Sequence, residues 1–289
     1  MAVTVPWTGT YNGLGFGPGT IVQWNNLDGL RGIPPLRSGD ISKARQDGDN
    51  AGLDFMSSRV FSIDFTIFNP SIAFETVMAQ VALACQPISD PSQQLPFEML
   101  LPGWATSRII TCRPTQAGAP IDAKFQYNAT TVPIQFTAND PLIYSSTLKQ
   151  AGPVGLPSPT AGLTFNVTFN ATFGASTGGS MSVTNSGNYL TAPVFTITGP
   201  MTNPSITFTS TGQFISFNLA LSAGDVLVVD TGNRLVTLNG TAARFNAVVT
   251  GSSWWGIPAG TWSIGVSSSD SATVAGTFAA AYRDAWGFM

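Results

Sequence analysis

The segment from Val22 to Phe68 constrains the fold most, because two β-type runs enclose a long polar stretch. Residues 21–25 and 60–67 place β-branched or aromatic side chains at alternate positions, a pattern typical of strands. A loop as long as the intervening stretch is uncommon in a compact domain and is usually functional or disordered. Its turn signals are Asp28-Gly29, Pro34-Pro35, Ser38-Gly39-Asp40 and Asp47-Gly48-Asp49.

This polar stretch carries charges of both signs and is close to neutral. Because opposite charges alternate along it, the stretch is suited to pair with a second copy of itself in a ring. A solvated surface loop that contacts nothing is the alternative. The interleaved residues are Arg31, Arg37, Lys43 and Arg45 on the basic side and Asp28, Asp40, Asp47 and Asp49 on the acidic side.

Composition favours a β-rich assembly component. Hydrophobic residues make up 43% of the 289-residue chain and charged residues only 9%, with 30 glycines and 20 prolines. Low charge with many turn formers is typical of a β-rich protein that packs its surface against neighbours. The net charge of −3 gives no support for capture of nucleic acid.

The sequence carries no recognisable signal for export, membrane insertion or metal binding. The first residues lack the regions of a signal peptide, and no apolar run approaches the roughly 20 residues that span a bilayer. The absence of histidine and of Cys-x-x-Cys spacing removes the usual zinc ligands, and we expect no cofactor. Cys85 and Cys112 are expected as free thiols, although they could pair in principle.

Charge density falls near residue 150, where a segment rich in proline and glycine begins. Up to Gln150 the chain has nine basic and eleven acidic residues, and from Ala151 onward it has three and four. We therefore predict an N-terminal domain at residues 1–150, a linker at 151–160 and a C-terminal domain at 161–289.

The N-terminal domain holds one convincing helix. Asn69 is a suitable N-cap with Pro70 at the first helical position, and an apolar stripe follows that stops at Pro87. The stripe consists of Phe74, Val77, Met78, Val81 and Cys85. Further strands are expected at residues 108–113, 122–128 and 132–137. The simplest α+β arrangement is a small barrel or split sheet that carries the helix.

The C-terminal domain consists of short strands throughout, so the whole chain is predicted to be mainly β. Many short strands at even spacing favour a β-sandwich or jelly roll. Turn signals at residues 230–233 and 239–240 predict a three-stranded meander. The expected strands are residues 163–173, 194–198, 206–209, 214–221, 226–229, 235–238, 262–266 and 273–282.

The sequence offers no favoured set of catalytic residues, and we expect that the protein is not an enzyme. Without histidine, Ser-His and Cys-His nucleophile schemes cannot form as usually built. Asp225 and Asp230 lie beside turns, where aspartate is common for backbone reasons, so a glycosidase pair is not favoured. The GLGFGPG run at residues 13–19 precedes a strand, so we interpret it as a flexible arm or turn and not as a phosphate loop.

Trp254, Trp255 and Trp262 form a second candidate contact region, for a glycan or a protein partner. A tryptophan cluster on a sandwich could stack on sugar rings, as in a carbohydrate-binding module. We favour the alternative in which some of the three fill the core while the others meet a neighbouring subunit. Sandwich folds host many functions, so the fold does not decide between the two.

Two segments resemble the distal tail proteins of long-tailed bacteriophages. DGLRG, the mixed-charge stretch and the strand SSRVFSIDFTIF, which Arg59 opens, resemble their N-terminal domain. LSAGDVLVVDTGNRLVTLNGTAAR, SSWWGIPAGTWSIGV and AAAYRDAWGF resemble their C-terminal β-sandwich. The order and spacing of these segments are preserved.

The resemblance implies a structural virion protein that closes a homohexameric ring through its N-terminal domains. Such a ring joins the tail tube protein to the tail tip, hub or baseplate, and galectin-like C-terminal sandwiches carry fibres or contact host-surface glycans. The protein would be assembled in the host cytoplasm and located at the virion tail tip. Candidate ring-interface residues are Asp28, Arg31, Arg37, Asp40, Lys43, Arg45 and Arg59.

Two other functions stay open on the sequence alone. The first is a receptor- or carbohydrate-binding tail protein that grips a cell-surface glycan through residues 254–262. The second is a major tail-tube subunit, for which a second sandwich would be superfluous. The segment 164–198 is rich in Thr, Asn and Gly, and no role is assigned to it.

Overall fold

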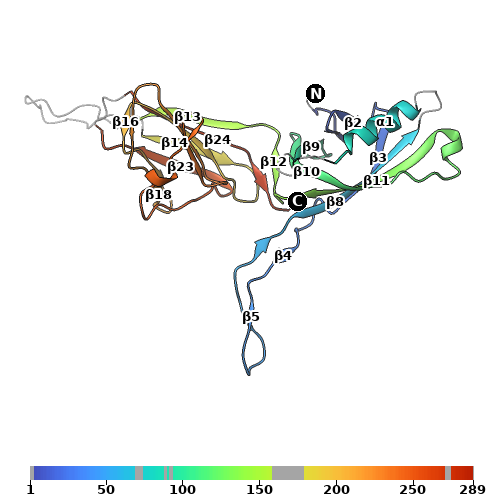
Figure 1. Ribbon diagram of the computed structural model, residues 1–289, viewed down its shortest axis with the longest axis horizontal. Helices are drawn as coiled ribbons and strands as arrows, with labels where there is room; N and C mark the ends of the chain where they lie inside the picture. The colour runs from blue at the N-terminus through green and yellow to red at the C-terminus, as the bar shows by residue number, and fades with distance from the viewer. Residues whose placement is uncertain are drawn as a thin grey trace, which may run out of the picture. The chain divides into compact units, whose positions relative to one another are not determined.

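The computed structural model describes residues 3–68, 74–87, 90, 94–157, 179–270 and 275–288. Its contacts divide the chain into two compact units, which are described separately (Figure 1). Unit 1 comprises Met1–Thr147 and Trp286–Met289, and unit 2 comprises Leu148–Ala285. Both are built mainly from strands, and α1 (Phe74–Ala84) is the one α-helix among the described residues. The predicted mainly-β class with one helix is therefore confirmed.

Unit 1 is built on one open sheet with the strand order β2-β1-β9-β10-β11-β8-β3. Strand β10 divides this sheet, because its first part pairs with β9 and β12 and its second part pairs with β11. Of the two predicted arrangements, the split sheet is therefore correct and the described strands close no barrel. The bounds are β1 Thr8–Tyr11, β2 Leu14–Phe16, β3 Val22–Asp28, β8 Arg59–Phe68, β9 Leu95–Leu100, β10 Arg108–Ala117, β11 Ala129–Ala138 and β12 Ile143–Ser145.

Helix α1 covers part of this sheet with one apolar face. Phe74, Val77, Val81 and Ala84 are buried in the same core as the strands. The predicted stripe is correct in its period, although Met78 and Cys85 are only partly buried and pack against the core. The predicted N-cap, Asn69 with Pro70, lies outside the described residues.

The prediction of a flexible arm or turn at residues 13–19 is correct for the two ends of the run and wrong for its middle, where strand β2 of a tight hairpin lies. Asn12 and Gly13 both have positive φ, 45° and 81°, as a two-residue turn of the type that matches strand twist requires. Asn-Gly is the strongest short hairpin signal, and its presence before Leu14 would have identified the β1–β2 hairpin.

Residues 122–128 were also predicted wrongly, since they form a turn with a short 3-10 helix, η1 (Phe125–Tyr127), instead of a strand. The carboxylate of Asp122 accepts a hydrogen bond from the Lys124 amide at 2.8 Å, which starts the turn. Asn128 ends it in a left-handed conformation with φ of 55°. Local side-chain hydrogen bonds of Asp therefore outweigh the strand preference of the aromatic residues.

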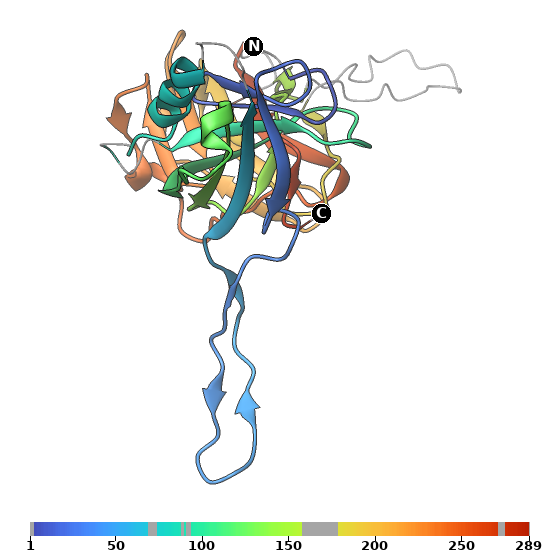
Figure 2. The ribbon, with the colours of Figure 1, turned by 90° about the vertical axis from the view of Figure 1, so that its right-hand side faces the viewer.

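The long polar stretch of unit 1 is a two-stranded arm, which we define as residues 29–57. It continues β3 and β8, which pair with each other from Val22 opposite Ile67 to Asp28 opposite Ser62. Figure 2 shows the arm leaving the body of unit 1 as an extended hairpin. Its paired strands are β4 (Leu36–Arg37) with β7 (Phe55–Met56), and β5 (Ile41–Ser42) with β6 (Asp49–Asn50).

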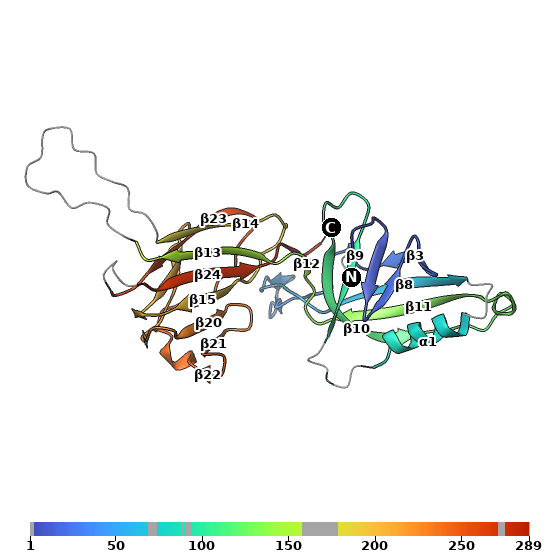
Figure 3. The same ribbon diagram turned by 90° about the horizontal axis from the view of Figure 1, so that it is seen from above.

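Unit 2 is a sandwich of a six-stranded and a four-stranded antiparallel sheet around one core. Figure 3 shows the larger sheet from above, with β13, β24, β15, β20, β21 and β22 side by side in that order. The smaller sheet has the order β14-β23-β17-β18. The bounds are β13 Lys149–Gly155, β14 Ser180–Asn185, β15 Val194–Thr198, β16 Met201–Thr202, β17 Ser205–Phe208, β18 Gln213–Ser216, β19 Ala220–Leu221, β20 Val226–Asp230, β21 Leu235–Leu238, β22 Ala242–Ala243, β23 Gly260–Ser267 and β24 Thr277–Tyr282. The last strand, β25 (Ala285–Trp286), pairs with β12 in the sheet of unit 1. A 3-10 turn, η2, covers Phe245–Ala247.

Most predicted strands of unit 2 lie where the structure has them, and the meander of β20, β21 and β22 is confirmed. The run at 214–221 is divided into β18 and β19, while the strand expected at 163–173 lies outside the described residues. Strand β13 occupies the first part of the expected linker at 151–160. It tolerates Gly152 and Pro153 because it is an edge strand with a bulge between Ala151 and Val154.

Candidate assembly interface

The arm leaves unit 1 at a turn that only glycine fits. Gly29 has φ of 80°, and its amide donates a hydrogen bond to the Asp28 carboxylate at 2.8 Å. A Cβ at this position would lie 2.6 Å from the carbonyl oxygen of Val60 on the neighbouring strand. Asp28, a candidate interface residue, is therefore part of the hinge at which the arm begins.

Arg59 holds the base of the arm from inside unit 1. Its side chain is 1% exposed, and its guanidinium donates hydrogen bonds to four backbone carbonyls. Burial lowers the pKa of Arg59, but an arginine stays charged in proteins. The four acceptors are the carbonyls of Leu30, Gly32, Pro141 and Gly287.

This burial changes the role that the sequence suggested for Arg59. The sequence predicts Arg59 as a ring-interface candidate, but its guanidinium is directed inward and has almost no exposed surface to offer a neighbouring copy. We therefore assign Arg59 to the joint between the arm, the loop at Pro141 and the C-terminal segment. The position of Arg as the first residue of a strand did not reveal this, because the four acceptors are distant in sequence.

The remaining charged candidates lie on the arm or at its base, and all are exposed. Among the described residues, no ion pair joins any of them to another side chain. Besides Asp28, Asp40 is held locally, since its carboxylate accepts the Gly52 amide at 2.7 Å and its own amide donates to the Ser38 hydroxyl at 3.1 Å. Hydrogen bonds with Ser38 and Gly52 lower the pKa of Asp40. The exposed charged candidates are Asp28, Arg31, Arg37, Asp40, Lys43 and Arg45.

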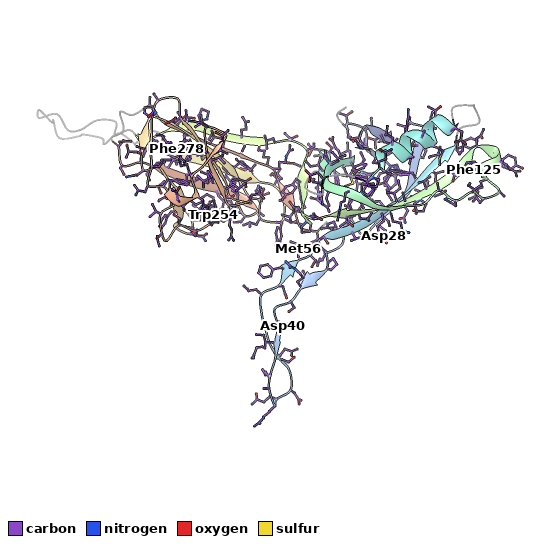
Figure 4. The ribbon with its side chains drawn as sticks, viewed as in Figure 1. Asp28, Asp40, Met56, Phe125, Trp254 and Phe278 are labelled. Carbon is purple, nitrogen blue, oxygen red and sulfur yellow. The ribbon has the colours of Figure 1, made fainter. Side chains whose placement is uncertain are left out.

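The arm also exposes large apolar side chains, which the sequence analysis did not single out. A two-stranded hairpin has no second layer to cover them, as the side chains around Asp40 and Met56 in Figure 4 illustrate. Clustered exposed apolar residues mark interaction surfaces, and an isolated hairpin is marginally stable in water. The exposed fractions are 64% for Ile33, 55% for Leu36, 69% for Ile41, 77% for Leu53 and 56% for Phe55. The occurrence of these apolar residues in an otherwise polar stretch is the sequence signal that would have identified them as candidate contacts.

The three tryptophans of unit 2 do not form one exposed platform. Trp255 is buried and stacks on Phe208, with ring centroids 5.1 Å apart. Trp262 is half-buried and its indole N–H donates to the Pro258 carbonyl at 3.1 Å. Trp254 is also half-buried, and it lies parallel to the exposed ring of Phe245. Of the three, Trp254 and Trp262 keep part of their surface exposed, and Trp254 lies beside the exposed ring of Phe245.

Neither a metal site nor a membrane segment is evident in the described part of the chain. No group of three or more Cys, Asp or Glu side chains there is arranged to hold a metal ion. No helix in the same residues is long and apolar enough to cross a membrane.

Comparison with known proteins agrees with the resemblance seen in the sequence. Residues 186–286, inside unit 2, match the family described as the C-terminal domain of the siphovirus-type tail component. No curated protein sequence matches the chain significantly. The match confirms the predicted resemblance to distal tail proteins for this part of the chain.

The fold extends the likeness to both units. The chain is similar to the crystal structure of SPP1 Dit, which is described as a paradigm of the hub adsorption apparatus in phages that infect Gram-positive bacteria. The match covers 96% of this chain and 98% of the SPP1 Dit chain, with 13% sequence identity and a TM-score of 0.64. A chain of the activated phage P2 baseplate with Ca is 11% identical over 91% of both chains, with a TM-score of 0.48. The chain thus has the fold of SPP1 Dit.

Proposed function

We propose that this protein is a structural component of the tail of a long-tailed bacteriophage and forms a distal ring between the tail tube and the tip or baseplate. The family match of residues 186–286 and the Dit fold support a distal tail role. The observation that carries the ring is the arm, which exposes apolar side chains and unpaired charges of both signs. In this role the protein is not an enzyme and needs no cofactor.

A ring closes when two different patches on each copy meet repeatedly through one rotation. The arm supplies one patch, in which alternating charges fix the register and apolar side chains supply most of the affinity. We infer a homohexamer from the resemblance to distal tail proteins. Copies assembled in the host cytoplasm would then be built into the virion at the tail tip.

Unit 2 is proposed as the hub surface for tip proteins or fibres. Its charged side chains are few and lie at strand ends and turns, so both sheets present mostly uncharged faces. Recognition of a host glycan through Trp254, Trp255 and Trp262 together is not part of this proposal, because Trp255 lies in the core.

The test is the native mass of the full chain over a concentration series, alone and mixed with the tail tube protein of the same phage. A sixfold multiple of the 30.3 kDa chain mass supports the ring. A monomer at every concentration in both samples would exclude it.

Charge reversal locates the interface. Arg37→Glu combined with Arg45→Glu should weaken assembly, because two attractive contacts become repulsive. Arg234→Glu combined with Arg244→Glu, on unit 2, is the matched control and should assemble as the wild type does. Assembly that survives the arm substitutions unchanged would remove the arm charges from the interface.

A further inference from the structure

Unit 1 contains an open groove between α1 and the β1–β2 hairpin. Its volume is about 380 Å³, and its apolar lining includes Leu14, Val22 and Val77. Ile21 and Leu83 lie in the same lining and are 45% and 62% exposed. The polar side chains of the lining are Asn12 and Gln80, and none of the described residues that line the groove is charged, so an apolar chain bound there would bury no unpaired charge.

The groove runs beside an unpaired sheet edge. Strand β2 is the last strand of the unit 1 sheet, and among the described strands it pairs with β1 alone. A Cβ placed on Gly13 or Gly15 would meet no atom within 4 Å, so the backbone of the hairpin is open to an approaching segment. An edge strand with free amides and carbonyls can pair with another chain, which adds backbone hydrogen bonds to apolar contact.

The groove and the arm lie at opposite ends of strand β3. Val22, the first residue of β3, lines the groove, and Asp28, its last residue, begins the turn into the arm. Seven residues of strand separate the two surfaces by about 20 Å, at about 3.4 Å per residue. The arm leads away from the body of unit 1 (Figure 2), so one copy presents the arm beyond one end of β3 and the groove at its other end.

We propose that the arm of one copy lies in the α1–β2 groove of the next copy, where Leu53 and Phe55 contact Ile21 and Leu83. This proposal rests on the proposed function and names the surface of the neighbour that receives the arm. Two different surfaces at opposite ends of one strand make a head-to-tail contact, which is the type that closes rings. In this contact the exposed apolar side chains of the arm are covered by the neighbouring copy. The apolar lining of the groove is removed from water at the same time.

Photo-crosslinking tests the contact directly in the full chain. Benzoylphenylalanine at position 55 replaces one aromatic side chain by another, and assembly from a mixture of ¹⁴N- and ¹⁵N-labelled chains distinguishes contacts between copies. Cross-links from residue 55 of one copy to residues 12–22 or 77–84 of another are expected. Cross-links to any other surface, in particles that have the ring mass, would overturn the groove while leaving the ring proposal intact.

Substitution at the rim gives an independent test with a matched control. Leu83→Glu should raise the concentration of half-assembly by tenfold or more, because it places a charge in the apolar contact. Leu235→Glu changes a leucine of similar exposure, 56%, on unit 2 and should leave that concentration unchanged. Equal melting temperatures of the two variants would show that folding is preserved. Assembly of Leu83→Glu at the wild-type concentration would overturn the inference.

Discussion

At the scale of single residues, Arg59 is the most informative position. A buried guanidinium with four carbonyl acceptors joins three segments that are distant in sequence. Only arginine has enough donors in a rigid fork for this geometry, since lysine offers three donors on one nitrogen. Arg59 therefore fixes where the arm leaves unit 1.

Replacing Arg59 should destabilise unit 1. Arg59→Met fills similar volume but leaves four carbonyls without a donor, of which those of Leu30 and Gly287 are buried, so we expect a loss of about 3 kcal/mol in the free energy of unfolding. Arg59→Lys should lower the free energy of unfolding by less than Arg59→Met, because lysine keeps a charged donor. Urea denaturation, with hydrogen exchange assigning the effect to unit 1 amides, measures both. Arg37→Met on the exposed arm is the control and should stay within about 0.5 kcal/mol. An equally small effect of Arg59→Met would contradict the structural role.

The two cysteines should be unreactive in the folded protein. Burial raises the pKa of Cys85 from 9.0 to about 11, and the pKa of the buried Cys112 is raised further. Both thiols stay protonated at pH 8, so Ellman's reagent should react slowly with the native chain and with two thiols in urea. Because the folded pKa of Cys85 lies above its ordinary value of 9.0, the free energy of unfolding is unaffected by this thiol below about pH 9 and decreases as the pH rises toward 11. Fewer than two thiols in urea without reductant would indicate a disulfide.

At the scale of elements, periodicity predicted what local sequence determines. Alternation located β8, β11, β15 and β20, and the 3.6-residue stripe located α1. Strand β2 and the turn at 122–128 were missed. Both segments are determined by turn-forming residues, Asn12-Gly13 in the first case and Asp122 in the second, and strand preference alone does not reveal them. Strand β13 was missed because its glycine and proline are tolerated only at a sheet edge, and edge position is a property of the assembled sheet.

In the candidate interface, too, local features were predicted from the sequence and features that depend on the folded unit were not. The sequence predicted a long polar loop and its charges, since both are local patterns, but not the pairing of that loop into a two-stranded arm. It could not find the apolar groove, whose lining comes from the β1–β2 hairpin, from Val22 and from α1. It also could not place Arg59, because burial depends on segments that meet only in the folded unit.

The arm depends on a close approach of its two sides at Gly39 and Gly52. A Cβ on Gly52 would lie 2.2 Å from the carbonyl carbon of Gly39, so Gly52→Ala should separate the sides at this point. The bonds from the Gly39 amide to the Leu53 carbonyl and from the Gly52 amide to Asp40 would break. We expect faster hydrogen exchange in the arm and about tenfold weaker assembly. Gly32→Ala, where an added Cβ meets nothing within 4 Å, is the control. Unchanged exchange in Gly52→Ala would show that the arm adapts to the methyl group.

At the scale of the whole molecule, unit 2 is inserted into the sequence of unit 1. Unit 1 includes the last residues, from Trp286, as well as everything before Leu148. Two arginines hold this C-terminal segment. The Gly287 carbonyl accepts a hydrogen bond from Arg59, and the Trp286 ring lies 3.7 Å from the guanidinium carbon of Arg108, which also lies 4.1 Å from the Trp104 ring. The stability of unit 1 therefore depends on residues that follow unit 2 in the chain.

Deleting Trp286–Met289 should weaken unit 1 and leave unit 2 intact. The deletion removes one cation–π contact and one charged hydrogen bond from buried or half-buried arginines, so we expect a loss of about 3 kcal/mol in unit 1. Hydrogen exchange resolved by segment measures each unit separately. A shorter deletion, of Phe288–Met289, keeps Trp286 and Gly287 and should have a smaller effect. Because Gly287 shares Arg59 with the base of the arm, the longer deletion should also raise exchange at residues 29–33 and weaken ring assembly. Loss of stability confined to unit 2 would mean that the C-terminal segment belongs to the sandwich and not to the ring-forming unit.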